Sequence, residues 1–214
     1  MKKVSDRMDH TIAYYDKNAV SFCLATRGAD MSFCRNKFLA LLDLSTRNCP
    51  NSPSNHNIHI LDAGCGSGRD SKAFLEAGYE VTSMDASEKI CQEAGKFLGR
   101  KVLHMSFEKM EFYRQFDGIW ACASLLHIPG EAISKVLLRC RRALKQHGVL
   151  YASMKYGQGE RVEGGRFFRY YMEEEIGQLM AGSGFAVAEL FVTKDVRVGR
   201  EGERWMNVLA NAAE

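Results

Sequence analysis

Hydrophobic positions along this chain follow two spacings, one helical and one extended. Residues 8–44 place apolar side chains three and four positions apart, which predicts two helices. From residue 58 onward, short apolar runs typical of buried strands alternate with segments of helical spacing. The expected strands are 58–62, 80–85, 101–107, 116–124, 149–155, 185–196 and 204–210, and the expected helices are 68–77, 87–99, 130–146 and 173–181.

This alternation predicts an α/β fold. Strands separated by helices form a parallel sheet with helices on both faces. The last two strands follow each other without a helix, so they should form a hairpin in which the final strand runs antiparallel to the others. The polar segment 45–57 holds two of the three prolines and is the expected linker. Residues 1–55 are then the N-terminal helices with their linker, and residues 56–214 are the core, within one structural domain overall.

Composition restricts the class of protein. The 214 residues, 46% of them hydrophobic, suit one well-buried globular domain. A net charge of +3 is too small to indicate a nucleic-acid or membrane surface. No apolar run approaches the ~20 residues of a membrane span, and the first residues lack the apolar core of a signal peptide. We therefore expect a cytoplasmic protein with no membrane partner, whose seven scattered cysteines are reduced thiols and not metal ligands.

The segment 58–70 contains the most informative motif. An apolar run ends in Asp62 and is followed by glycines at the alternate positions 64, 66 and 68. A buried strand that ends in glycines and leads into a helix presents backbone N–H groups at the carboxyl edge of a sheet, where open α/β folds bind ligands. The dinucleotide fingerprint G-x-G-x-x-G would need glycine where Arg69 stands, which disfavours a nicotinamide cofactor.

Together with Asp85 after the next strand, this G-x-G-x-G loop resembles motif I of the class I S-adenosylmethionine (SAM)-dependent methyltransferases. The resemblance covers about residues 58–210 and implies a Rossmann-like, seven-stranded, mostly parallel sheet with an antiparallel last strand and an N-terminal helical lid over the SAM pocket. The run 64–71, with arginine directly after the third glycine, also resembles small bacterial type-11 enzymes that include the tellurite-resistance methyltransferase. A first-turn ion pair explains Arg69 and Asp70 equally well.

The resemblance implies SAM as the cofactor and S-adenosyl-L-homocysteine (SAH) as the product. The glycine loop would pass beneath the methionyl part, Asp62 would hold its ammonium group, and Asp85 would accept hydrogen bonds from both ribose hydroxyls. Asp85 could instead be a helix-initiating carboxylate just before Ser87. The expected cofactor-binding residues are Asp62, Gly64, Cys65, Gly66, Gly68, Arg69, Asp85, Ala86, Ser106, Phe107 and Ala121.

The strand 116–124 and the turn after it limit the chemistry. They contain neither the Asn-Pro-Pro-Tyr motif of amino-group methyltransferases nor an acidic residue at the strand end to hold a metal. Methyl transfer from a sulfonium is an in-line displacement, so positioning should dominate. A general base matters only if the nucleophile must lose a proton, and His127 is the best-placed candidate. A histidine that merely caps the turn explains this residue equally well.

Loops that face the methyl group should determine the acceptor. The segments 155–171 and 193–204 are rich in cations, and the N-terminal segment adds aromatic residues. Arginine binds carboxylate and phosphate through paired hydrogen bonds, so a cationic mouth would suit a small polar or anionic acceptor. Interspersed acidic residues make ordinary surface ion pairs the competing explanation. The candidate mouth is Lys155, Arg166, Arg197 and Arg200, and the expected substrate residues are Tyr15, Lys155, Arg166 and Arg197.

The expected function is methyl transfer from SAM to an unidentified small polar or anionic acceptor. One alternative is a SAM-binding sensor or partner subunit without turnover, because the glycine loop predicts binding in either case. Another is an RNA or tRNA methyltransferase, suggested by the aromatic and cationic residues of 156–171. The nearly balanced charge makes nucleic acid the less favoured partner. The sequence contains no signal for the oligomeric state.

Overall fold

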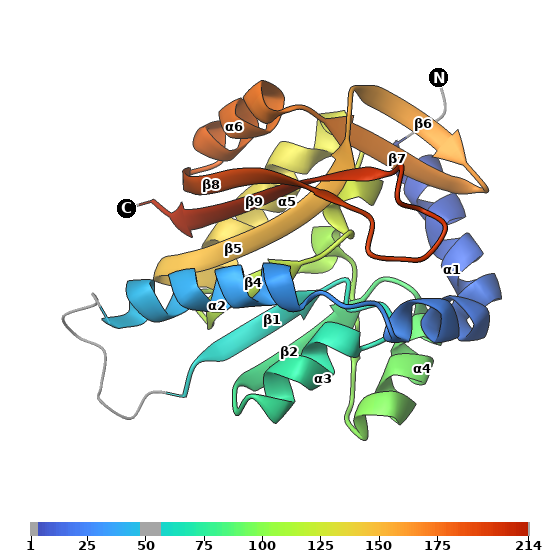
Figure 1. Cartoon of the computed structure of the whole chain (residues 1–214), viewed down its shortest axis with the longest axis horizontal. Coiled ribbons are helices and arrows are strands. Elements are labelled where there is room, and N and C mark those ends of the chain that lie inside the picture. Colours follow the sequence, from blue (N-terminus) through green and yellow to red (C-terminus); the bar gives the residue numbers. More distant parts are fainter. Residues whose placement is uncertain (1–3, 48–56, 214) are drawn as a thin grey trace.

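The central sheet has the expected topology. The computed structural model describes residues 4–47 and 57–213. Its seven main strands are β1 (His59–Ala63), β2 (Glu80–Asp85), β3 (Leu103–His104), β4 (Phe116–Ala121), β5 (Leu144–Tyr156), β8 (Phe185–Lys194) and β9 (Arg204–Ala212). They lie in the order 3-2-1-4-5-9-8. Neighbouring strands from β3 to β5 pair in parallel, and β9 is antiparallel to both β5 and β8 (Figure 1). The seven-stranded, mostly parallel sheet with an antiparallel last strand is thus confirmed.

Helices cover both faces of this sheet (Figure 1). They are α1 (Val4–Arg27), α2 (Ser32–Arg47), α3 (Arg69–Glu76), α4 (Glu88–Leu98), α5 (Gly130–Ala143) and α6 (Glu173–Gly182). The apolar side chains of α5 and α6 share one core with one face of the sheet, whereas α2 and α3 pack with the opposite face. No described helix is both long and apolar enough to span a membrane.

A β-hairpin stands where the sequence analysis expected a loop. Strands β6 (Gly159–Glu163) and β7 (Arg166–Tyr171) pair in antiparallel, and β7 continues the sheet by pairing with the end of β5. The two residues between them, Gly164 and Gly165, both have positive φ angles, of 54° and 81°. A Gly-Gly pair between two strands is a common hairpin turn. The Gly-Gly pair is visible in the sequence, and the prediction of a loop over residues 155–171 was wrong for β6 and β7.

Other element boundaries also differ from the expectation: β4 ends at Ala121 and not at residue 124, and β5 begins at Leu144 and not at residue 149. Strand β3 contains only Leu103–His104 of the expected 101–107, and a short 3-10 turn follows at Phe107–Lys109. Helix α5 ends at Ala143, because Leu144 is already paired with Phe116 of β4. Long-range pairing therefore overrides the helical spacing that continued to residue 146.

Helix α2 belongs to the helical layer that covers one face of the sheet. Its residues Phe38 and Leu42 are fully buried, and the Phe38 ring lies 5.4 Å from the ring of Trp120 on β4. A Cβ at Gly118 of β4 would stand 2.6 Å from the Phe38 ring, so the close approach of helix and strand requires glycine there. Helix α1 instead packs against α4 and β7. Residues 48–56 of the expected linker lie outside the described residues, and movement of residues 1–55 as a lid stays a prediction.

Removing the Phe38 ring should destabilise the whole protein. We expect Phe38→Ala to lower the free energy of unfolding by about 3–5 kcal/mol, as is usual for a buried phenylalanine. Urea denaturation followed by circular dichroism measures this loss. The matched control is Leu44→Ala on the same helix, where the side chain is 58% exposed and the expected change is below ~1 kcal/mol. Equal losses in the two variants would contradict the assignment of α2 to the core.

Candidate functional site

A cavity of about 310 Å³ opens at the carboxyl edge of the parallel strands. The ends of β1, β2, β4 and β5 form its floor, and α1, the β6–β7 hairpin and the β8–β9 loop contribute to its walls. The expected residues that line it are Tyr15, Asp62, Gly64, Cys65, Gly66, Arg69, Asp85, Ala86, Ser106, Phe107, His127, Lys155, Arg166 and Arg197. The topology thus brings most of the candidate residues together in one place.

Gly68 and Ala121 are the two expected residues outside the cavity lining. Gly68 is the residue that precedes the first turn of α3 and has a left-handed backbone. The side chain of Ala121 is fully buried in the sheet, because β4 ends at this residue and the chain turns afterwards. The next three residues, 122–124, line the cavity in its place.

The glycine loop is held by hydrogen bonds from its own backbone. The N–H groups of Gly64 and Cys65 donate to the carbonyl of Met84, and that of Gly66 donates to Asp85 over 3.1 Å. A Cβ at Gly64 would stand 2.4 Å from the Cβ of Ser124, too close for any side chain. The loop therefore crosses the strand ends with bare backbone toward the cavity.

Asp85 is a buried carboxylate at the end of β2. Its oxygens accept hydrogen bonds from the N–H groups of Gly66 and Ser87, and burial raises its pKa. The side chain that caps α4 belongs to Ser87, which accepts from the N–H of Ile90. A carboxylate has about four acceptor positions, so Asp85 retains capacity for a further donor. This geometry suits a vicinal diol.

Asp62 lies deep beside the loop. It accepts a hydrogen bond of 2.5 Å from the hydroxyl of Ser71, which also contacts the Ser83 hydroxyl at 2.7 Å. Burial, with a smaller contribution from Asp70, raises the pKa of Asp62 to about 7. The charge of Arg69 acts to lower this pKa but does not offset the burial of the carboxyl. An ammonium group in the cavity would supply a further cation.

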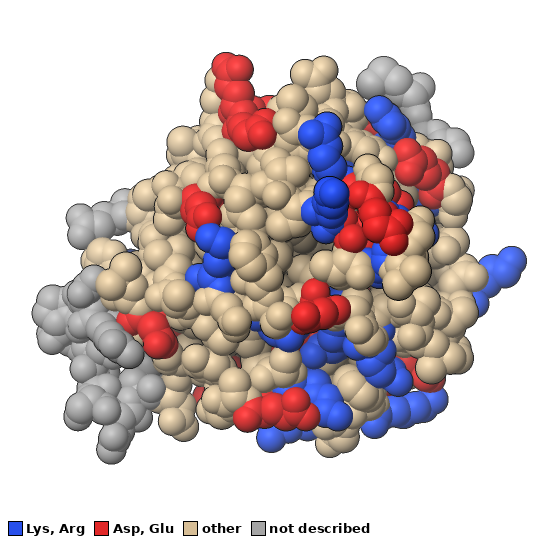
Figure 2. Space-filling model, viewed as in Figure 1, with Lys and Arg blue, Asp and Glu red and all other residues tan. Residues whose placement is uncertain are grey.

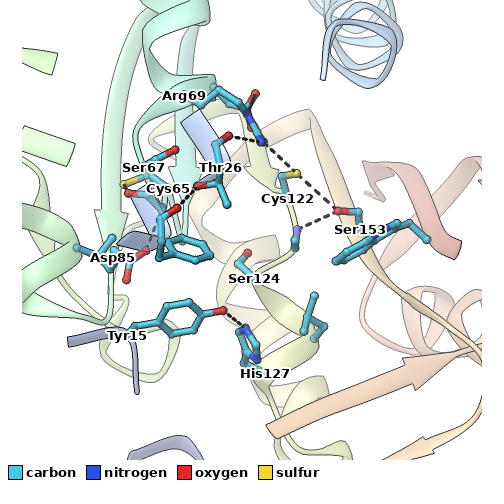
Figure 3. Close-up of a pocket in the computed structure, with 18 of the residues that line it drawn as sticks. Tyr15, Thr26, Cys65, Ser67, Arg69, Asp85, Cys122, Ser124, His127 and Ser153 are labelled. Atoms are coloured by element: carbon cyan, nitrogen blue, oxygen red, sulfur yellow. Dashed lines mark hydrogen bonds and ion pairs between the residues drawn. The ribbon is translucent and has the colours of Figure 1, made fainter. Parts of the chain in front are cut away.

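Asp70 is the centre of a charged network. Arg69 donates to it at 2.5 Å, Arg35 of α2 at 2.6 Å, and the indole of Trp120 at 3.1 Å. The first-turn ion pair considered for Arg69 and Asp70 is therefore present, although Arg69 also lines the cavity and reaches the Thr26 carbonyl at 3.4 Å (Figure 3). Two guanidinium groups thus share the carboxylate of Asp70. The role of Arg35 could not be found from sequence, since nothing in its helix marks it.

Tyr15 and His127 form a hydrogen-bonded pair at the other side of the cavity (Figure 3). The Nδ1 atom of His127 lies 2.6 Å from the Phe167 carbonyl, which can only accept, so Nδ1 carries the proton. Nε2 then accepts the hydrogen bond of 2.8 Å from the Tyr15 hydroxyl. Burial and the nearby Arg166 lower the pKa of His127 to about 4. His127 is thus neutral at physiological pH, with its lone pair occupied by Tyr15.

Carboxylates pair with most of the cations that were expected to form the entrance of the cavity. Lys155 is ion-paired with Glu203, Arg197 with Asp195 at 2.5 Å, and Arg200 with Glu203 at 3.1 Å. Figure 2 likewise shows basic and acidic side chains interspersed over one face of the molecule. Arg166 differs from the other three because it has no ion pair with a carboxylate among the described residues.

Comparisons with known proteins agree with this geometry. Residues 61–152 match the family model described as a methyltransferase domain. Less than half of the chain is thus similar to the SAM-dependent methyltransferases. The matched residues of the methyltransferase domain run from β1 into β5, the part of the sheet that carries the glycine loop and Asp85.

Curated relatives of the methyltransferase domain are ubiquinone biosynthesis O-methyltransferases. The protein from Coxiella burnetii is 28% identical over 101 residues, covering 44% of this chain and 42% of the relative. That from Dechloromonas aromatica is 33% identical over 101 residues, covering 44% and 43%. The chain thus spans less than half the length of the curated relatives it matches.

Solved structures share the fold of this chain. The 1,6-didemethyltoxoflavin-N1-methyltransferase of Burkholderia thailandensis superimposes with a TM-score of 0.72 at 18% identity, covering 100% of this chain and 92% of its own. The magnesium protoporphyrin IX methyltransferase of Synechocystis gives 0.67 at 17% identity, with 100% of both chains covered. At such identities the likeness concerns the fold alone.

Affinity for SAM should depend on the ionisation of Asp62. With a pKa of about 7, this carboxyl is charged above that pH and protonated below it, so it loses its attraction for an ammonium group as the pH falls. We expect the ratio of SAM affinities, wild type over Asp62→Asn, to fall by up to about tenfold per pH unit below pH 7. Calorimetric titration at several pH values measures it, and the ratio cancels the titration of SAM itself. A ratio independent of pH would contradict the assignment.

His127 should remain neutral in the folded protein well below the usual histidine range. Its pKa of about 4 lies below the value of about 6.5 in an unfolded chain, so it favours folding above pH 6.5, and this contribution is lost as the pH falls toward 4. We expect its imidazole NMR signals, assigned by their absence from His127→Gln, to stay unchanged from pH 8 down to about 5. A titration midpoint near 6.5 would be inconsistent with this burial.

Proposed function

We propose that the protein transfers the methyl group of SAM to a small polar acceptor bound in the same cavity. One observation carries this proposal. The cavity is continuous from the glycine loop and Asp85 to a second region lined by Ser153, Lys155 and Trp205 at the ends of β5 and β9. A sheet edge with a nucleotide-type loop and an adjoining pocket provides space for a donor and an acceptor side by side.

The first region has the charges and hydrogen-bonding groups that SAM requires. Asp85 would accept from the ribose hydroxyls, and Asp62 would face the ammonium group. Arg69, which lines the cavity, would attract the methionyl carboxylate. A Cβ at Gly66 would lie 3.5 Å from the Phe22 ring of α1 and would fill the gap between loop and helix. When bound, SAM supplies an electrophilic methyl group on a cationic sulfur.

The second region suits a small acceptor. It is lined by Phe33 of α2 and by Trp205 and Asn207 of β9 in addition to its charged residues. The solved relative from Burkholderia thailandensis holds 1,6-didemethyltoxoflavin, a small molecule, together with SAH. That precedent supports a small-molecule acceptor, and the interspersed surface charges in Figure 2 give no support to a nucleic acid.

The chain's own residues would act chiefly by positioning and by exclusion of water. Tyr15 reaches over the cavity from α1, and its hydroxyl is fixed in direction by His127. Because His127 is neutral and already bonded, it orients Tyr15 and does not itself face the acceptor with a free lone pair. Proximity of aligned reactants can supply effective concentrations up to ~10⁸ M, which is enough for an in-line displacement without metal ligands among these residues.

Binding and turnover can be tested separately. We expect calorimetry to show binding of SAM and SAH, weakened about 10- to 100-fold in Asp85→Ala, because one or two charge-assisted hydrogen bonds are lost. The control Glu76→Gln changes a carboxylate on α3 that is 68% exposed and should leave affinity unchanged. Release of SAH with an acceptor library then measures turnover. Binding of SAM without release of SAH for any acceptor would favour a sensor, and absence of binding would contradict both.

A further inference from the structure

Arg166 has the environment of an anion-binding residue. It begins β7 and lines the cavity, and its guanidinium carbon lies 4.8 Å from the ring centre of Tyr14, 5.0 Å from that of Phe168 and 5.9 Å from that of Tyr15. Aromatic faces hold a guanidinium in place by cation–π attraction but do not neutralise its charge. Its buried Nε atom has no hydrogen-bond partner. Arg166 is therefore fixed in direction, charged and incompletely satisfied.

Neighbouring groups leave that charge uncompensated. Glu163 is the residue opposite Arg166 in the hairpin register, but its carboxylate accepts from the Tyr170 hydroxyl at 2.9 Å and lies 4.0 Å from Arg161. Burial raises the pKa of Tyr15 and lowers that of His127, so both are neutral groups at physiological pH, and the charge of Arg166 opposes the first shift and adds to the second. An anion entering the cavity would supply the missing partner.

We propose that Arg166 binds the oxyanion of the methyl acceptor, and that this oxyanion, a carboxylate, phenolate or enolate, is the atom that becomes methylated. This inference rests on the proposed function. The inference predicts that the acceptor is an acid ionised at oxygen and not an amine. The cation–π contacts would aim the guanidinium, which would be the donor to the oxyanion, because the proton of the Tyr15 hydroxyl is already donated to His127.

The change of charge during transfer favours this class. A lone pair of the acceptor oxygen forms the new carbon–oxygen bond, the carbon–sulfur bond breaks, and sulfur keeps that electron pair. An anion and a cation thereby become two neutral products, and no proton moves. An amine acceptor would instead leave a new cation near Arg166, which costs free energy in a partly apolar cavity. With a pKa of about 4, His127 is also a poor acceptor for a proton released by a neutral nucleophile at pH 7.

Two probes of similar shape can distinguish these classes. The protein loaded with SAH is titrated with 4-nitrophenol and with 4-nitroaniline, and binding is followed by calorimetry and by the absorbance of the phenolate. We expect the wild type to bind 4-nitrophenolate in preference to the amine and to lower the apparent pKa of the bound phenol. Arg166→Met should weaken phenolate binding by about tenfold or more, the effect of one lost charge-assisted hydrogen bond.

Arg166→Lys retains the charge and should retain part of the binding. The matched control is Arg161→Met on the same hairpin, whose guanidinium lies 4.6 Å from the Tyr170 ring and whose side chain is 59% exposed. It should bind like the wild type. Affinity for SAH, measured on every variant, confirms an intact donor site.

Three results would overturn the inference while SAH binding remains intact. They are equal binding of the amine and the phenolate, equal binding by Arg166→Met and Arg161→Met, and no binding of the phenolate by the wild type. Failure of SAH to bind the wild type would instead count against the proposed function itself, so the two failures are distinguishable.

Discussion

The close contact between Gly64 and Ser124 determines how the cavity is built. No side chain fits at Gly64, since a Cβ there would lie 2.4 Å from that of Ser124. Ser124 in turn donates to the Ala63 carbonyl over 2.7 Å, so the end of β1 and the turn after β4 are tied together. The loop can then direct its backbone N–H groups to Met84 and Asp85 at the end of β2. One steric constraint thus aligns three strand ends around a common opening.

Sequence patterns predicted those parts of the fold that depend on residues close together in the chain. The strand boundaries at Glu80–Asp85 and the Ser87 cap follow from apolar runs and turn chemistry, and the structure confirms them. The position of Leu144 in β5 depends instead on Phe116, a partner far away in sequence. The hairpin of β6 and β7 was missed although its Gly-Gly turn is visible, because glycine-rich, charged segments resemble loops in composition.

The candidate site likewise combines features that the sequence predicts with features that depend on contacts between distant residues. Strand order alone brings most of the candidate residues to one cavity, since parallel strands end at one edge. Which charges remain available there could be predicted only in part. The pair of Arg197 with Asp195 is local, two residues apart in the sequence. Lys155 of β5 meets Glu203 only because β9, which follows Glu203, pairs with β5. Arg35 belongs to the site through α2 packing alone, which leaves no trace in the glycine motif.

Helix α1 is attached to the rest of the molecule by polar contacts at several points along its length. Arg7 pairs with Glu160 of the hairpin at 2.8 Å, and Asp16 accepts from Ser87 at 2.6 Å. Tyr15 lies between these two attachments, bonded to His127. Apolar contacts add to this attachment, because Ala19 and Cys23 of α1 are buried against Ile90 of α4. These contacts hold α1 against the hairpin and α4 on either side of Tyr15, and movement of this helix as a lid stays a prediction.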